Sequence, residues 1–338
     1  MSETVERLPR RDGVAAAPSG ALSEQLGTVS WGPLQFVKGH GTENDFVLLP
    51  DPDDSIELTP DLVRGLCDRH AGIGADGVIR VVRVGPTGFF MDYRNADGST
   101  AEMCGNGARV FARYLVDAGW VTPGRIEFET RGGPRWAELG AVGNVAVGMG
   151  AVRVGDISSA RIAGDDIRGL VVDVGNPHLA CLVDGDVARF DLTAAPSIDA
   201  GVFPDGANVE VVQVLGPDRV RMRVHERGVG ETRSCGTGTV AAAAAYLAAE
   251  GRHKGRVTVD VPGGTVTVGI SAHPHGPQAT LVGPAVLVAA GTVDPAGLRI
   301  ATAGADIARR LRREHRHRRF LSATGAGTGA LRENMARW

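Results

Sequence analysis

The chain contains few cysteines and no strong excess of either charge. Its 338 residues include four cysteines, and the formal net charge is -3 at pH 7. So few cysteines, without a C-x-x-C pair, exclude a disulfide-built scaffold and are typical of thiols kept reduced in the cytoplasm. A near-neutral charge gives no overall attraction to nucleic acid or to an anionic membrane. We therefore expect a cytoplasmic protein with neither nucleic acid nor a membrane among its partners.

Long apolar runs are also absent, since none approaches the ~20 residues needed to span a bilayer. Residues 1–30 lack a continuous secretory core and predict a disordered leader. Residues 295–338 predict a flexible basic tail without an assigned function, because seven arginines and two histidines crowd residues 309–319 without aromatic interleaving. The remaining sequence is long enough for two domains with hydrophobic cores.

One pattern is present twice. Cys104-Gly-Asn-Gly and Cys235-Gly-Thr-Gly each run into a helical, alanine-containing stretch. Upstream polar positions recur in the same order at an offset of about 131 residues, pairing Asn44 with Asn176, Gly77 with Asn208 and Asn95 with Glu226. A repeat of this length indicates a duplicated domain rather than a solenoid unit. We expect residues 31–149 and 150–280 to form two similar domains facing each other across a cleft, with a segment at about 281–293 returning to the first.

Each half of the sequence predicts many short strands around one central helix. Apolar alternation interrupted by Gly and Pro predicts the strands, the last of them at about 285–288. Helical patterns cover residues 60–69, 105–118 and 236–250. The fold class is therefore α/β, of the α+β type, with two pseudo-symmetric domains.

Both repeated cysteines precede a predicted helix. A thiol at a helix start meets exposed N–H groups and the positive end of the helix dipole, which we expect to lower its pKa from about 8.5 toward neutrality. The same N–H groups can hold a carboxylate. Racemisation requires one group to remove an α-proton and a second group to donate a proton on the opposite face. Cys104 and Cys235 are thus the candidate acid and base, whereas Cys67 and Cys181 are expected to be core thiols.

Five strings together resemble the diaminopimelate epimerase family. They are HGTENDF (residues 40–46), RNADGSTAEMCGNGAR (94–109), GNPH (175–178), NVEVVQ (208–213) and ERGVGETRSCGTGT (226–239). The resemblance implies an isomerase that interconverts LL- and meso-2,6-diaminopimelate, in lysine and peptidoglycan precursor biosynthesis. It implies no cofactor and no metal, a β-barrel-like sheet around the central helix of each domain, and a homodimer.

The resemblance also assigns roles by motif. Cys104 and Cys235 would be the catalytic pair, with His178 and Glu226 modulating their pKa values. The substrate-binding residues would be Asn44, Asn95, Gly105, Asn106, Asn176, Asn208, Glu226, Arg227, Gly236 and Thr237. Arg227 would bind the distal carboxylate as a planar fork. Gly77 departs from the pattern, because some members carry a substrate-contacting Gln there.

Three alternatives stay open from the residues alone. A proline racemase or hydroxyproline epimerase also uses paired Cys-Gly motifs, but its cyclic monoacid substrate has no distal head group. In the second alternative the protein is an oxidoreductase in which Cys104 and Cys235 form a disulfide. The position of each cysteine at the start of a separate helix disfavours such a disulfide. A non-catalytic amino-acid-binding protein would need the polar contacts but not both thiols.

Overall fold

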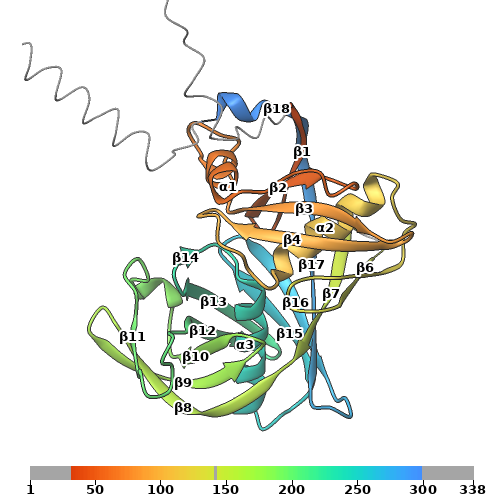
Figure 1. The fold of residues 1–338 in the computed structure, drawn as a ribbon. Helices are drawn as coiled ribbons and strands as arrows, with labels where there is room; N and C mark the ends of the chain where they lie inside the picture. The colour runs from red at the N-terminus through yellow and green to blue at the C-terminus, as the bar shows by residue number, and fades with distance from the viewer. Residues whose placement is uncertain (1–31, 141–142, 299–338) are drawn as a thin grey trace, which may run out of the picture.

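The structure is a computed structural model that describes residues 32–140 and 143–298. Within these residues it contains three α-helices and two β-sheets, drawn in Figure 1. The predicted leader, and the predicted tail beyond residue 298, lie outside the described residues. No helix in the described part of the chain is long and apolar enough to cross a membrane.

Four strands of the first half and the last strand of the described chain form a five-stranded sheet of order β18-β1-β2-β3-β4. The first half also contains two helices. The elements of the first half are β1 (Leu34–Gly41), β2 (Asn44–Pro50), α1 (Pro60–Cys67), β3 (Gly77–Val84), β4 (Gly88–Asn95), α2 (Gly105–Asp117), β5 (Arg125–Phe128), β6 (Arg135–Leu139) and β7 (Asn144–Ala151). The last strand, β18 (Val286–Val293), pairs antiparallel with β1. The first and last described strands are therefore neighbours.

The second half builds most of the larger sheet. Its elements are β8 (Arg153–Ile162), β9 (Asp165–Asp173), β10 (Pro177–Val183), η1 (Val187–Arg189), β11 (Ser197–Ile198), β12 (Asn208–Gly216), β13 (Arg219–Glu226), β14 (Gly230–Thr232), α3 (Gly236–Ala249), β15 (Gly255–Val261), β16 (Gly264–Ser271), β17 (Gln278–Pro284) and η2 (Pro295–Gly297). The larger sheet has the order β11-β8-β9-β10-β12-β13-β15-β16-β17-β7-β6-β5, with β14 pairing to β13. Because β17 pairs with β7, this sheet joins strands from both halves.

The two halves repeat one arrangement of strands. In the first half β2 runs parallel to β3, with Phe46 opposite Gly77. In the second half β10 runs parallel to β12, with His178 opposite Asn208. The three predicted helices are confirmed within two residues at each end. The predicted strand at 285–288 is wrong in its bounds, because Ala285 separates β17 from β18.

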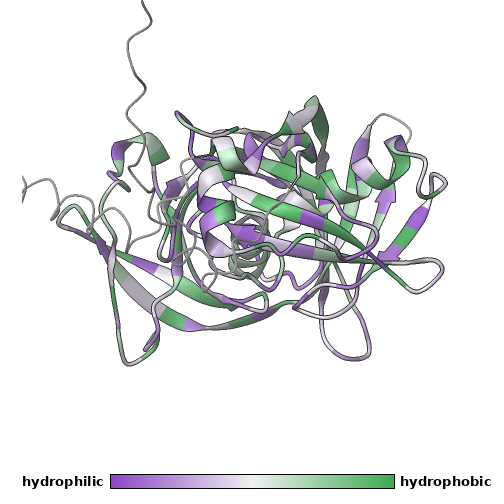
Figure 2. Cartoon of the chain, turned by 45° about the horizontal axis from the view of Figure 1, so that its top comes forward, coloured by the Kyte–Doolittle hydropathy of each residue, from purple (hydrophilic) through white to green (hydrophobic). Residues whose placement is uncertain are grey.

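Each half encloses one helix among its strands. Helix α2 packs against strands that include β1, β2, β6 and β7, and α3 packs against β9, β10, β12 and β15, as Figure 1 shows. All residues of α3 from Thr239 to Leu247 are buried, which explains its alanine-rich sequence: small side chains let strands approach it from all sides. Apolar residues alternate with polar ones along many strands in Figure 2. One hydrophobic cluster includes buried residues of both helices, so the halves share a core.

The N-termini of α2 and α3 meet inside this shared core. A Cβ placed on Gly236 would lie 3.1 Å from the Cα of Gly105 and 3.4 Å from the backbone nitrogen of Asn106. Backbone atoms cannot swing aside as a flexible side chain does. Glycine at position 236 therefore allows the two helix starts to approach closely.

We expect Gly236→Ala to destabilise the protein by ~1–3 kcal/mol, because the added methyl group forces the two helix starts apart. Urea unfolding measures the change in free energy. Gly269→Ala on β16 is the matched control, since its Cβ would meet no atom within 4 Å. Equal stability of the two variants would contradict the close approach described above.

Candidate active site

Cys104 and Cys235 are the N-cap residues of α2 and α3. The sulfur of Cys104 accepts a hydrogen bond from the Gly107 N–H at 3.4 Å, and that of Cys235 accepts one from the Gly238 N–H at 3.4 Å. The prediction that both thiols begin helices is confirmed. Because the two helix starts abut, the fold brings both sulfurs to one junction.

The prediction that these thiols have lowered pKa values is wrong. Burial raises the pKa of the Cys104 thiol to about 11, although the Gly107 N–H acts in the opposite direction. Burial raises the pKa of Cys235 well above its usual range, and the carboxylates of Glu226 and Glu210 add to the increase. The helix N-terminus does favour the thiolate, but loss of solvent outweighs it. Both thiols are therefore protonated at neutral pH.

A hydrogen-bond network beside Cys104 ties the two halves together. The side-chain oxygen of Asn44 lies 3.8 Å from the Cys104 sulfur and accepts a hydrogen bond from the side-chain amide of Asn106 at 3.1 Å. The same Asn106 amide donates to the backbone oxygen of Ser234 at 3.1 Å. The Asn44 amide donates to the Asp76 carboxylate at 2.8 Å, which fixes the orientation of its side chain. Asn44 and Asn106 thus lie at the predicted site.

A second network lies beside Cys235. The Thr237 hydroxyl is 3.5 Å from the Cys235 sulfur and accepts from the Asn176 amide at 3.4 Å. The Asn176 oxygen in turn lies 3.0 Å from Nε2 of His178. Nδ1 of His178 contacts Glu210 at 2.7 Å. His178 therefore reaches Cys235 through Asn176 and Thr237.

Glu226, the last residue of β13, forms a hydrogen bond with Cys235 and accepts another from the Thr232 hydroxyl. Burial raises the pKa of the Glu226 carboxyl, while these two hydrogen bonds act in the opposite direction. The Glu226 charge also raises the pKa of Cys104. A carboxyl group with a raised pKa beside a thiol is a suitable acceptor for the thiol proton.

Arg227, predicted to bind the distal carboxylate, contacts Asn208, another of the predicted substrate-binding residues. The backbone N–H of Arg227 donates to the Asn208 side-chain oxygen at 2.8 Å. The guanidinium of Arg227 is exposed, and its Nη1 donates to the backbone oxygen of Asp205 at 3.0 Å. Most of its N–H groups thus remain available for a planar anion.

Asn95 lies at the end of β4, and its amide contacts side chains of the first half. Its oxygen accepts from the Tyr93 hydroxyl at 2.9 Å, and its nitrogen donates to Ser99 at 3.0 Å. The Tyr93 ring fills the space beside Gly77, where a Cβ would come within 2.7 Å of the ring. The Tyr93 ring explains why no larger side chain fits at position 77.

Sequence reasoning missed four buried residues at this junction. They are Tyr93, Arg109, Glu210 and Ser234. Arg109 is fully buried on α2, donates to Thr42, Gly105 and Pro284, and has its pKa lowered by burial to about 10. Arg109, Glu210 and Ser234 stand inside the recognised strings, but nothing in the sequence marks their burial.

Cys67 and Cys181 are buried free thiols away from the helix starts, as predicted. Burial raises the pKa of each to about 12.

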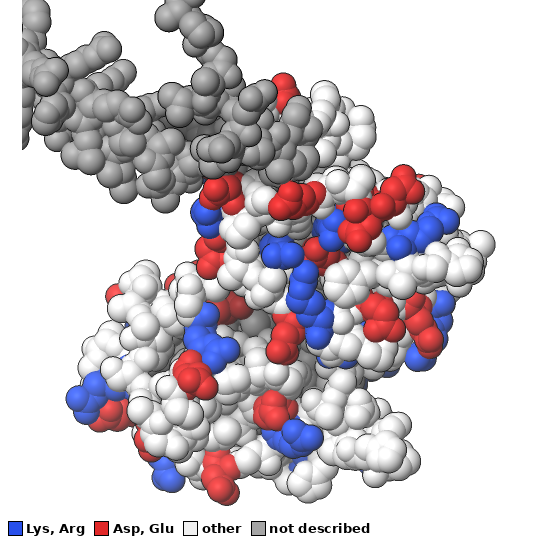
Figure 3. Space-filling view, viewed as in Figure 1, with Lys and Arg blue, Asp and Glu red and all other residues white. Residues whose placement is uncertain are grey.

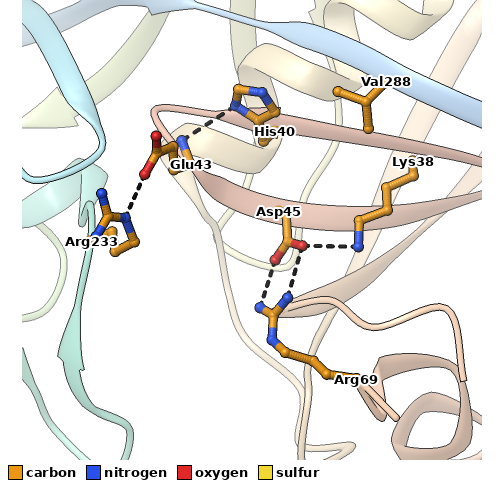
Figure 4. A pocket seen from close by; sticks show the side chains of 7 residues that line it. All are labelled: Lys38, His40, Glu43, Asp45, Arg69, Arg233 and Val288. Carbon is orange, nitrogen blue, oxygen red and sulfur yellow. Dashed lines mark hydrogen bonds and ion pairs between the residues drawn. The ribbon is translucent and has the colours of Figure 1, made fainter. Parts of the chain in front are cut away.

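A pocket of about 490 Å³ lies beside Glu43 and Asp45, at the turn from β1 to β2, as Figure 4 shows. Its charged residues pair with each other: Asp45 contacts Lys38 at 3.0 Å and Arg69 at 2.9 Å, and Glu43 pairs with Arg233. Neither catalytic candidate lines this pocket. On the face drawn in Figure 3, acidic and basic side chains are interspersed, with no large area of one sign.

The fold belongs to a class whose solved members include isomerases. A PhzF-family protein from Bacillus anthracis matches with a TM-score of 0.62 at 17% identity, covering 78% of this chain and 99% of that one. A probable proline racemase from Agrobacterium radiobacter K84 matches with a TM-score of 0.58 at 15% identity, covering 77% and 92%. At these identities the likeness concerns the fold alone.

The family is more specific than the fold. The diaminopimelate epimerase family model matches residues 36–155 and 170–288. The diaminopimelate epimerase of Rhodococcus jostii is 52% identical over 285 residues, covering 77% of this chain and 97% of the relative. That of Thermobifida fusca is 52% identical over 280 residues, covering 79% and 100%. This chain belongs to the diaminopimelate epimerase family.

We expect the alkylation rate of Cys104 by iodoacetamide to rise with pH around a midpoint near 11. A raised pKa leaves less thiolate at a given pH, so labelling at neutral pH should be slower than for a free cysteine of pKa ~8.5. Peptide mass spectrometry separates the four cysteines, and Cys104→Ala identifies the signal. A midpoint near neutrality would restore the expectation drawn from the helix dipole alone.

Proposed function

We propose that this protein interconverts LL- and meso-2,6-diaminopimelate by proton transfer between the substrate α-carbon, Cys104 and Cys235, without a cofactor. The observation that carries the proposal is the pair of thiols capping two abutting helices. A two-base inversion needs similar groups on opposite faces of one carbon. Relatives that match nearly all of their own length support diaminopimelate as the substrate. The reaction belongs to lysine biosynthesis.

The proton balance of the reaction is simple. A thiolate at one cysteine takes the α-proton and becomes a thiol, and the electron pair of the broken C–H bond stays on the substrate as a carbanion. The thiol of the other cysteine gives its proton to the opposite face and becomes a thiolate. No net proton is consumed. Reversing the roles of Cys104 and Cys235 reverses the direction of turnover.

Formation of the first thiolate needs an acceptor for its proton. Glu226 is hydrogen-bonded to Cys235, and burial raises the pKa of its carboxyl group. We infer that Glu226 accepts the Cys235 proton when substrate binds. The substrate ammonium group then compensates the new negative charge. His178 modulates the same thiol through Asn176 and Thr237.

The helix starts are suited to the reacting carboxylate. The N–H groups of Gly105, Asn106, Gly236 and Thr237 belong to the first turns of α2 and α3, where helical partners are lacking. A carboxylate placed there meets two helix dipoles at once. Charge that develops on it as the α-proton leaves is stabilised by the same groups.

The remaining polar residues are suited to a second amino-acid head group. Asn95, Asn176 and Asn208 supply amide donors and acceptors, and Arg227 supplies a planar cation. A cyclic monoacid has no group to occupy this distal set, which disfavours the proline racemase alternative. Cytoplasmic location and a homodimer are part of the proposal.

Replacement of either Cys104 or Cys235 by Ala should lower epimerisation by at least ~10²-fold, since each face of the carbanion needs its own proton carrier. The assay follows deuterium incorporation from solvent at the α-carbon together with formation of the other stereoisomer. Cys67→Ala is the matched control, because this buried thiol belongs to another cluster and should keep activity within ~2-fold. Near-normal turnover of either active-site variant in both directions would contradict the two-base assignment.

Arg227→Lys should reduce kcat/KM for LL-diaminopimelate despite the conserved charge, because an ammonium group lacks the planar fork. Wild-type enzyme should prefer LL-diaminopimelate over L-lysine by on the order of 10⁴. Arg221→Lys, at an exposed position on β13, the strand that ends just before Arg227, is the control. Comparable kcat/KM values for the two amino acids in the wild type would remove the case for a distal recognition site.

A further inference from the structure

We propose that Glu210 is a positioning residue that acts through His178 on Asn176 and, through Thr237, on Cys235. The proposal rests on the proposed function, because it assigns a role in the same site. Glu210 lies on β12, is fully buried, and is neither one of the two thiols nor a member of the substrate-binding set.

The burial of Glu210 is unusual for a carboxylate. Its Oε1 lies 2.7 Å from Nδ1 of the fully buried His178. Its Oε2 has no hydrogen-bond partner among the described residues. A buried carboxylate is costly unless it is paired and hydrogen-bonded, and replacing such a pair by apolar residues is often neutral or stabilising. Stability alone therefore gives no reason for the pair.

The hydrogen bonds of His178 have one consistent direction. Asn176 presents its oxygen to Nε2, and an amide oxygen only accepts, so Nε2 must carry a proton. Glu210 shares a proton with Nδ1, which satisfies the other side of the ring. With its oxygen held by His178, Asn176 turns its amide nitrogen to the Thr237 hydroxyl. If Nε2 lost its proton, it would become an acceptor and the Asn176 amide would flip.

The other half of the repeat shows that the scaffold does not require this pair. On β2 and β3 the equivalent positions are Phe46 and Ile79, both fully buried, as the strand registers establish. A Cβ on Gly107 would meet Ile79 at 3.0 Å, and a Cβ on Gly238 would meet Glu210 at 2.8 Å. The first turn of each catalytic helix thus rests on one of these two side chains. The polar pair is a property of the Cys235 side alone.

The test compares Glu210→Gln with wild type in two measurements. Gln keeps the shape but removes the charge. We expect kcat/KM for LL-diaminopimelate to fall roughly 10-fold to 100-fold, through loss of a hydrogen bond to a charged group. We expect the midpoint of alkylation against pH to move down for Cys235, because one of its two neighbouring carboxylates is gone while Glu226 remains. The midpoint for Cys104 should stay unchanged.

Two further variants are controls that distinguish an effect of the Glu210 charge from a general effect on packing. His178→Phe with Glu210→Ile copies the apolar pair of the first half, should fold, and should move the Cys235 midpoint in the same direction. Ile79→Val alters packing beneath Cys104 without changing charge, and should move neither midpoint.

An unchanged Cys235 midpoint in Glu210→Gln, or equal movement of both midpoints, would overturn the positioning role. The alkylation experiment needs no substrate. Failure of wild-type enzyme to epimerise diaminopimelate would therefore count against the proposed function, while the labelling result would still decide the role of Glu210.

Discussion

The close approach of two helix N-termini is the constraint on which the site depends. Gly236 has no side chain, so α3 can begin against the backbone of Gly105 at the start of α2. Each helix then carries a thiol at its cap and unpaired N–H groups in its first turn. The shared core and the hydrogen bonds from Asn106 to Ser234 hold this contact in place. Catalytic geometry is thus set by backbone packing more than by any single polar contact.

The repeat is symmetric in backbone but not in charge. Around Cys104 the buried ion is Arg109, whose counterpart in the second half is Val240 on α3. Around Cys235 the buried ions are Glu226 and Glu210, the latter replacing Ile79. The two thiols therefore share a local geometry and the negative charge of Glu226, which Arg109 opposes at Cys104 and Glu210 reinforces at Cys235. The two halves thus share a backbone arrangement and differ in a few buried residues.

The sequence was sufficient for the parts of the site that depend on local pattern. Glycine after cysteine, followed by a helical run, predicted both N-caps, and the family resemblance assigned Asn44 and Asn176 to the substrate site. The pKa values were not predictable in this way, because burial sums over strands far apart in the chain and exceeds the effect of the helix dipole. Glu210 was missed because β12 alternates apolar and polar residues as a half-exposed strand would, yet residues 208–212 are buried on both faces.

The pairing of β18 with β1 has a consequence for how the chain acquires its structure during synthesis. Leu34 lies opposite Val293, so the first described strand cannot complete its ladder until residue 293 has left the ribosome. Arg109 adds to this delay, since it donates to the carbonyl of Pro284. Contacts between such distant residues slow folding, because a long loop must close before they form. Until β18 has been synthesised, the first half therefore keeps an open sheet edge at β1, and the nascent protein is prone to aggregation during that interval.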